Sequence, residues 1–185
     1  TRKLIGYVAH ESDLDPWLTL KQNIQFTANL YGIEQNLCNE RIQKYCDFLG
    51  LLPYLNEFTF QVSSGIKKKT MLVRELVHDP TILILDEPTS FMDAESIRLT
   101  WDLLKELKGK KSIIYVSHSL TEIEQAHDRI LVFNEGKIIM DGHLDKLLES
   151  TLDYHQFQIE FEDLSDTLYK KLTTVSTVVS PNKME

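Results

Sequence analysis

The sequence has 185 residues, of which 42% are hydrophobic and 26% are charged, and its formal net charge is −8. This composition is typical of a globular protein with one domain and an appendage. The acidic balance argues against a dedicated nucleic-acid-binding protein, which needs a basic surface for phosphates, and no apolar run approaches the roughly 20 residues of a membrane-spanning helix.

The first predicted element is a short buried strand within KLIGYVAHE, residues 3–11. A helix is then predicted between Thr19, a good N-cap, and Gly32, a good C-cap. A second helix is expected within residues 39–49, closed by Gly50, and a third from residue 64 to 78, ended by an Asp-Pro pair. Residues 19–79 therefore form an all-helical insertion.

Strands and helices alternate after this insertion. TILILDEP, residues 81–88, is an unbroken apolar run of the kind buried on both faces of a parallel sheet. A helix follows over residues 94–108, then a strand over 111–118, a short helix over 119–127 and a hairpin over 129–142. This order predicts an α/β fold with a parallel sheet. Beyond residue 142 the pattern weakens to a helical turn at 144–148, a strand at 155–163 and a helix at 165–175.

Three smaller features have plain interpretations. The lysine run at residues 67–69 is most simply a solvated helix face. Cys38 and Cys46 have no CxxC or histidine spacing, so we expect reduced thiols and no metal site. The chain begins at Thr1, almost directly in a strand and without a signal peptide, and we expect a truncated product.

The chemistry-bearing residues follow two neighbouring strands. Asp86 and Glu87 end one strand, and Ser117 and His118 end the next. Ligands of an open parallel sheet bind at the carboxyl ends of its strands, so these side chains should share one edge. One carboxylate suits Mg²⁺, the second can orient a water, and a histidine can hold an oxygen that gains charge. Together they describe metal-assisted hydrolysis of a phosphoanhydride.

Taken singly, each of these residues has a simpler interpretation. An Asp-Glu-Pro sequence after a strand is in most cases a cap and turn, and a lone His118 is more often a packed or solvated imidazole. The ordered set is what favours chemistry.

That ordered set resembles a known family. VSSGIKKKTMLVRELVHDPTILILDEPTSFMDAES followed by KSIIYVSH strongly resembles the second half of an ATP-binding cassette (ABC) ATPase, and IGYVAHESDLDPWLTLKQNIQFTANLYGI resembles the segment before the helical subdomain of that family. The similarity runs from about Leu4 to Gly142. It implies an incomplete P-loop NTPase-like parallel sheet with an all-helical insertion subdomain. The implied parts are the start of the ATPase core with the Q-loop region (1–18), the helical signature subdomain (19–79), the rest of the core (80–142) and a C-terminal extension (143–185).

The resemblance also implies roles for individual residues. LILDE matches the Walker B strand, with Asp86 for Mg²⁺ and Glu87 as the general base, and His118 matches the switch histidine near the γ-phosphate. SFMD matches the D-loop, which implies Ser90 and Asp93 at a dimer interface.

VSSGI matches the signature motif, which implies that Ser63, Ser64 and Gly65 contact ATP held by a partner subunit. These residues open a helix, where free N–H groups and a partial positive charge attract phosphate and a glycine permits close approach. The simpler alternative is a helix N-cap without a ligand.

The sequence departs from the family pattern at several positions. His10 stands where the family usually has a glutamine that contacts Mg²⁺ and water, and a ring nitrogen is a poorer partner for a hard cation. The signature has Ser64 and Ile66 where glycine and glutamine are common. No G-x-x-x-x-G-K-[ST] motif is present, since neither Gly-Lys pair (109–110 and 136–137) has its context. We therefore expect a fragment without its own P-loop, inactive alone.

The expected function is ATP binding and hydrolysis in an ABC transporter, at the cytoplasmic face of a membrane, with ATP and Mg²⁺ as cofactors. NLYGIEQ and the C-terminal region favour exporters with separate ABC-2-type membrane subunits. Expected partners are a second ATPase subunit and an integral membrane subunit, with no nucleic acid. Two alternatives stay open: a non-catalytic cassette that supplies the signature motif in trans, and a soluble ABC ATPase of translation or DNA repair. Residues 150–185 either begin an accessory domain or pack on the sheet.

Overall fold

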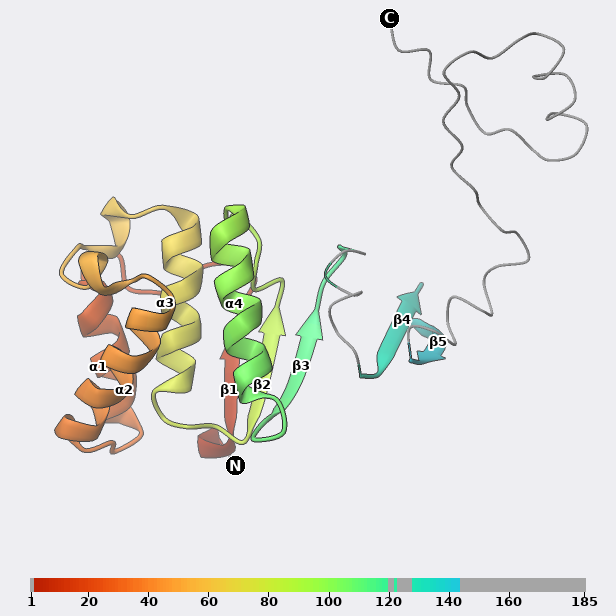
Figure 1. Ribbon diagram of the computed structural model, residues 1–185, viewed down its shortest axis with the longest axis horizontal. Coiled ribbons are helices and arrows are strands. Elements are labelled where there is room, and N and C mark those ends of the chain that lie inside the picture. Colours follow the sequence, from red (N-terminus) through yellow and green to blue (C-terminus); the bar gives the residue numbers. More distant parts are fainter. Residues whose placement is uncertain (1, 120–121, 123–127, 144–185) are drawn as a thin grey trace, which may run out of the picture. The chain divides into compact units, whose positions relative to one another are not determined.

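The computed structural model describes residues 2–119, 122 and 128–143. The chain divides into two compact units, Thr1–Ala126 and His127–Glu185, which we describe separately (Figure 1). Most of the helix predicted over 119–127, and every element predicted beyond residue 143, lies outside the described residues. The domain boundaries predicted at residues 18, 79 and 142 stay predictions.

A three-stranded parallel sheet forms the centre of the first unit, as the sequence predicts. Its strands lie in the order β1-β2-β3, with these bounds: β1 (Ile5–Val8), β2 (Ile82–Asp86) and β3 (Ser112–Val116). The pairing of β1 with β2 ends at Val8 and Leu85, and β2 pairs with β3 as far as Asp86 and Val116. The ends of all three strands therefore reach the same edge.

The described part of the first unit also has four α-helices and three short 3₁₀ helices whose bounds are known. Their bounds are α1 (Leu20–Leu30), α2 (Gln35–Phe48), α3 (Ser64–Leu76), α4 (Ala94–Leu107), η1 (Arg2–Leu4), η2 (Leu52–Tyr54) and η3 (Thr59–Gln61). Thr19 caps α1 through a capping box with Gln22, and Gly32 has a left-handed φ of 72° just beyond the helix. Helix α2 begins four residues earlier than predicted, because the Glu34 side chain caps it.

The hydrophobic core lies between the sheet and helices α3 and α4, which cover one of its faces (Figure 1). Val8, Leu83 and Leu85 of the sheet are fully buried there, and the amphipathic face of α4 contributes Trp101 and Leu104. Helix α1 packs on α3. Burial of each large aliphatic side chain contributes about 1.5–3 kcal/mol, which makes this layer the main source of stability.

The prediction that β2 is buried on both faces is wrong for the described residues. Leu83 and Leu85 are completely buried, whereas Ile82 and Ile84 alternate with them and are only half-buried. On β3, Ile114 and Val116 are 53% and 49% exposed. Among the described residues, helices cover only one face of the sheet, and alternate strand residues point to opposite faces.

The described part of the second unit is an antiparallel hairpin of β4 (Ile130–Asn134) and β5 (Lys137–Gly142). Glu135 and Gly136 turn the chain with φ of 47° and 74°, the signs that a two-residue type I′ turn requires. This confirms the predicted hairpin. Within the described ranges, no helix has the length and hydrophobicity needed to cross a membrane.

Candidate functional site

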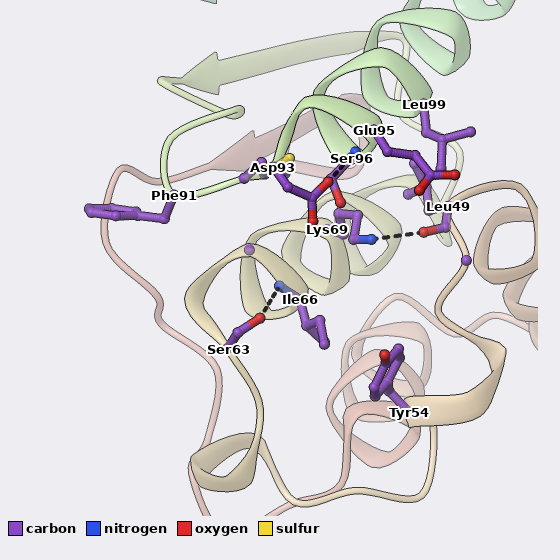
Figure 2. Close-up of a pocket in the computed structure, with 13 residues that line it drawn as sticks. Leu49, Tyr54, Ser63, Ile66, Lys69, Phe91, Asp93, Glu95, Ser96 and Leu99 are labelled. Atoms are coloured by element: carbon purple, nitrogen blue, oxygen red, sulfur yellow. Dashed lines mark hydrogen bonds between the residues drawn. The ribbon is translucent and has the colours of Figure 1, made fainter.

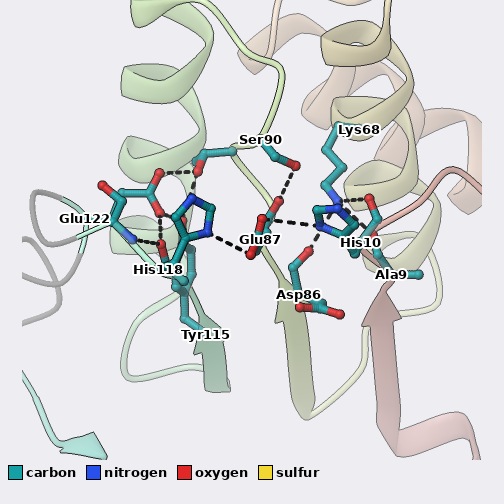
Figure 3. A network of polar contacts seen from close by, with 12 residues as sticks. Ala9, His10, Lys68, Asp86, Glu87, Ser90, Tyr115, His118 and Glu122 are labelled. Atoms are coloured by element: carbon teal, nitrogen blue, oxygen red, sulfur yellow. Dashed lines mark hydrogen bonds and ion pairs between the residues drawn. The ribbon is translucent and has the colours of Figure 1, made fainter. Parts of the chain in front are cut away.

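The carboxyl edge of the sheet brings together three of the residues that the sequence singled out. His10 follows β1, Glu87 follows β2 and His118 follows β3 (Figure 3). Each strand therefore delivers one polar side chain to this edge, as parallel packing of neighbouring strands requires.

Glu87 lies between the two histidines. Its Oε1 is 2.8 Å from Nδ1 of His118, and its Oε2 is 3.3 Å from Nδ1 of His10. The Glu87 side chain is 26% exposed, whereas those of His10 and His118 are 45% and 82% exposed. The contact with His118 is a hydrogen bond, and because a carboxylate only accepts, Nδ1 of His118 is the donor and its Nε2 is left for another partner. The contact with His10 is an ion-pair distance.

The backbone at Glu87 is held in an uncommon conformation. Its φ of 45° lies in the left-handed region, which costs a non-glycine residue on the order of 1 kcal/mol. The Glu87 N–H donates to the carbonyl of Val116 at 2.9 Å, and the Ser90 hydroxyl donates to the Glu87 carbonyl at 2.8 Å. These bonds orient the Glu87 carboxylate toward the histidines. The Ser90 hydroxyl therefore forms its hydrogen bond within the turn that follows β2.

The Asp86 carboxylate lies beside Glu87 and the two histidines, and none of the hydrogen bonds drawn in Figure 3 reaches this carboxylate. No cluster of three or more metal-ligating side chains occurs among residues 2–119, 122 and 128–143. Mg²⁺ needs only one or two protein carboxylates when phosphate oxygens and waters complete its shell. The donor set therefore fits a phosphate-bound Mg²⁺ held through Asp86.

A third carboxylate, that of Glu122, accepts hydrogen bonds from hydroxyl groups beside His118 (Figure 3). It accepts from Ser117 at 2.5 Å, from Tyr115 at 2.8 Å and from Thr89. Burial alone would raise the pKa of the Glu122 carboxyl, but the three hydroxyl bonds together lower it. Burial also raises the pKa of the Tyr115 phenol. This network ties the segment after β3 to the turn after Glu87.

The predicted phosphate-contacting residues open helix α3. Ser63 is the N-cap, and its hydroxyl accepts from the N–H of Ile66 at 3.4 Å. Ser64 is exposed at the first helical position, whereas Gly65 is buried. A Cβ on Gly65 would lie 2.9 Å from the carbonyl oxygen of Phe91. The glycine therefore allows the start of α3 to approach the segment that follows β2.

A cavity of about 380 Å³ lies between the start of α3 and the start of α4 (Figure 2). Its wall includes Ser63, Phe91, Asp93 and Glu95. Asp93 caps α4 by accepting from the N–H of Ser96 at 2.7 Å, a bond that lowers the pKa of the Asp93 carboxyl. Asp93 and Glu95 outnumber the lysine in this wall, Lys69, whose ammonium is already bonded to the carbonyl of Leu49, so the cavity itself does not suit phosphate. Residues 63–65 would have to contact phosphate from their exposed side.

The prediction that residues 67–69 form a solvated helix face is wrong for two of the three. Lys68 and Lys69 are only 3% and 7% exposed. The Lys68 ammonium donates to backbone carbonyls, and Lys69 donates to the carbonyl of Leu49 at 3.0 Å. Spacing held a clue, because Lys68 precedes Leu72 and Leu76 at four-residue intervals on the buried side of α3.

Glu122 and Lys68 are the residues of this edge that sequence reasoning missed. Glu122 lies four residues after His118, one helical turn along a segment predicted to be helical. Neither residue belongs to a short motif. Lys68 bonds to carbonyls 18 or more residues away, and Glu122 bonds to Thr89, 33 residues away, as well as to Ser117 and Tyr115 nearby.

Comparisons with known proteins find similarity to ATP-binding proteins of ABC transporters. A family profile described as ABC transporter matches residues 1–90. The chain is 31% identical over 141 residues to the ABC transporter ATP-binding protein NatA of Bacillus subtilis (strain 168), covering 76% of this chain and 57% of that protein. It is 30% identical over 152 residues to the Nod factor export ATP-binding protein I of Burkholderia lata, covering 82% and 50%. The chain thus spans about half the length of these curated relatives.

Solved structures show the same fold. The structure described as the ATP-binding subunit of an ABC transporter superposes with a TM-score of 0.74 at 25% identity, covering 93% of this chain and 69% of that one. A dimeric ATP-binding cassette in a post-hydrolysis state, bound to ADP and Pi, superposes with a TM-score of 0.67 at 24% identity, covering 76% and 62%.

Proposed function

The chain belongs to the ABC transporter family of ATP-binding proteins, and from this premise we propose that it forms part of an ATP-hydrolysing subunit that energises export through a separate membrane subunit. Export is supported by the relatives named for Nod factor export. The proposed location is the cytoplasmic face of a membrane. The sequence holds no P-loop motif, and we propose that a segment outside these 185 residues completes the cassette.

One observation carries the proposal: Glu87 lies between His118 and His10 at the edge that also presents Asp86. Glu87 is a carboxylate aimed by a fixed turn, and it can accept the proton of a water that attacks the terminal phosphate. His118 donates a hydrogen bond through Nδ1 and so orients Glu87. The Nε2 atom of His118 then remains to face the phosphate. Asp86 would hold Mg²⁺, which supplies charge stabilisation to phosphate oxygens.

The second contact that we propose lies at the start of α3. Ser63, Ser64 and the free N–H groups of the first turn would bind the phosphates of ATP held by a second ATPase subunit. In this arrangement Ser90 and Asp93 lie near the interface, where their bonds to Glu87 and Ser96 shape the intervening turn.

The test of catalysis is ATP hydrolysis by the protein expressed from its complete reading frame. Glu87→Gln keeps the size of the side chain but removes the base, and turnover should fall by about 10²–10⁴-fold. Glu106→Gln is the matched control, because Glu106 is an exposed residue near the end of α4, where it pairs with Lys44 at 3.6 Å. Equal activity of Glu87→Gln and the wild type would exclude Glu87 as the base.

The test of the α3 contact is ATP-driven dimerisation. Ser63→Arg places a long cation where the partner's phosphate should sit, and the dimer formed by the Glu87→Gln protein with ATP should disappear. Asn36→Arg adds the same charge at the exposed start of α2 and should leave the dimer intact. A dimer that survives Ser63→Arg would remove residues 63–65 from the interface. Co-purification of an integral membrane protein tests the transporter partner.

One observation favours a second candidate, a non-catalytic cassette. His10 occupies Oε2 of Glu87, where a glutamine is usual in the family and where an attacking water would bind. In this case the complete protein is inert, Glu87→Gln changes nothing, and Ser63→Arg still reduces ATP hydrolysis by an active partner subunit.

A further inference from the structure

Lys68 makes an unusual set of hydrogen bonds beside the catalytic edge. Its ammonium nitrogen donates to the carbonyl of Ala9 at 2.8 Å, of His10 at 2.6 Å and of Asp86 at 3.2 Å (Figure 3). A lysine ammonium has three protons, so all of them are used. The residue is 3% exposed, and such a group is retained inside a protein only when it is fully hydrogen-bonded.

The three carbonyls lie just beyond the last residues that pair β1 with β2. Pairing between β1 and β2 ends at Val8 and Leu85, and the carbonyls belong to the next residues on each segment. Beyond this point the two segments diverge, and the Lys68 ammonium bridges them. Hydrogen bonds from a charged donor are roughly twice as strong as neutral ones, so this bridge is a strong restraint on their spacing.

The separation of these two segments matters because they carry the reactive side chains. The His10 ring and the Glu87 carboxylate, which lie 3.3 Å apart, are attached to the segments that Lys68 joins. Lys68 itself belongs to α3, whose first turn carries Ser63 and Ser64. A displacement of α3 therefore pulls on the carbonyls of His10 and Asp86.

We propose that Lys68 is a positioning residue: it sets the separation of the His10 and Asp86 segments and mechanically couples the start of α3 to the Glu87 edge. This inference rests on the proposed function, with Glu87 as the base and residues 63–65 as the contact to the partner's nucleotide. Lys68 touches neither nucleotide nor water in this scheme.

The buried ammonium of Lys68 has a desolvation cost, seen in the pKa of Lys68, which burial lowers although Asp86 and Glu87 oppose the shift. Methionine fills a similar volume without that cost, but it leaves the carbonyls of Ala9, His10 and Asp86 without their donor. Lys69 provides the internal comparison. It is buried to a similar degree on the same helix, but among the described residues its ammonium donates to a single carbonyl, that of Leu49 at 3.0 Å.

The experiment compares Lys68→Met with Lys69→Met in the protein expressed from its complete reading frame. Both changes should lower Tm. Lys68→Met should reduce kcat about tenfold or more with little change in KM for ATP, because misplacement by a fraction of an ångström is enough. Lys69→Met should keep kcat within about threefold. Lys68→Arg, which retains charged donors, should recover part of the loss.

Hydrogen–deuterium exchange gives a readout that does not depend on hydrolysis. Lys68→Met should accelerate exchange in residues 9–12 and 86–91 together, whereas Lys69→Met should not. If the wild type lacks ATPase activity, the proposed catalytic function fails, and the exchange result alone decides whether Lys68 joins the segments. If Lys68→Met does not fold, Lys68→Gln takes its place. Equal kcat losses in the two lysine variants, or unchanged exchange in Lys68→Met, overturn the inference.

Discussion

Gly65→Ala tests how tightly the start of α3 is packed against the segment that follows Glu87. The added Cβ would lie 2.9 Å from the Phe91 carbonyl oxygen and 3.5 Å from the Met92 Cα. An ordinary contact begins near 3.4 Å, so the two backbones must separate by about half an ångström. Phe91 has little freedom to yield, because its φ is already 65° and the Met92 N–H bonds to the Thr89 carbonyl at 3.2 Å.

Two effects of opposite sign decide how much Gly65→Ala changes the free energy of unfolding. Overpacking in a close contact costs typically about 1–3 kcal/mol. Replacing glycine by alanine inside a helix contributes up to about 1 kcal/mol in favour of folding, and less in the first turn. The net effect on the free energy of unfolding should therefore be a loss of about 1–2 kcal/mol, which corresponds to a decrease in Tm of roughly 3–6 °C for a chain of this size.

Urea unfolding followed by circular dichroism measures this change. Ser64→Ala is the matched control, because Ser64 is the neighbouring residue, is exposed and belongs to the same helical turn. Its effect should stay within about 0.5 kcal/mol. A Gly65→Ala protein as stable as the wild type would show that helix propensity outweighs the contact, and the stated reason for glycine at this position would be wrong.

Two further predictions concern pH and thiol chemistry. The hydrogen bond from Lys111 lowers the pKa of Asp79 below its usual 3.8, so the carboxylate stabilises the fold above pH 4 and this stability is lost as the pH falls through the folded-state pKa. Because Asp79 is 56% exposed, Asp79→Asn should lower the free energy of unfolding by only about 0.5–1 kcal/mol at pH 7. In urea unfolding at pH 3, the wild type and the variant should differ less in stability. An equal stability difference at pH 7 and pH 3 would contradict this prediction. Burial raises the pKa of the Cys46 thiol to about 12 and also raises the pKa of the Cys38 thiol. A thiol reagent should therefore label neither cysteine in the native protein and both cysteines in denaturant. Rapid labelling of the native protein would show that the thiols are not buried.

Much of the architecture is predictable because its causes are local. Thr19, Ser63 and Asp93 cap their helices through bonds to residues three positions ahead, so a short window of sequence contains the whole interaction. The hairpin turn at Glu135 and Gly136 depends on backbone conformation at two residues. The early start of α2 was missed because a glutamate at residue 34 is a weak N-cap signal.

The candidate site was predicted in outline. Strand order alone places Glu87 and His118 at one edge, and the structure brings them to 2.8 Å. His10 was considered as a substituted glutamine, and its direct contact with Glu87 emerges only from the structure. The lysine run was misinterpreted, because hydrophilic character predicts exposure unless partners are known.

The sequence by itself determined most of the elements, the caps of α1, α3 and α4, and the meeting of Glu87 with His118 at the sheet edge, since periodicity and strand order depend on neighbours along the chain. Tertiary structure alone decided what Lys68 does. Its three acceptors lie 59, 58 and 18 residues away, and a buried ammonium is stable only where the fold assembles carbonyls around it. Interactions of that kind exist only after the chain has packed, so no local pattern can announce them.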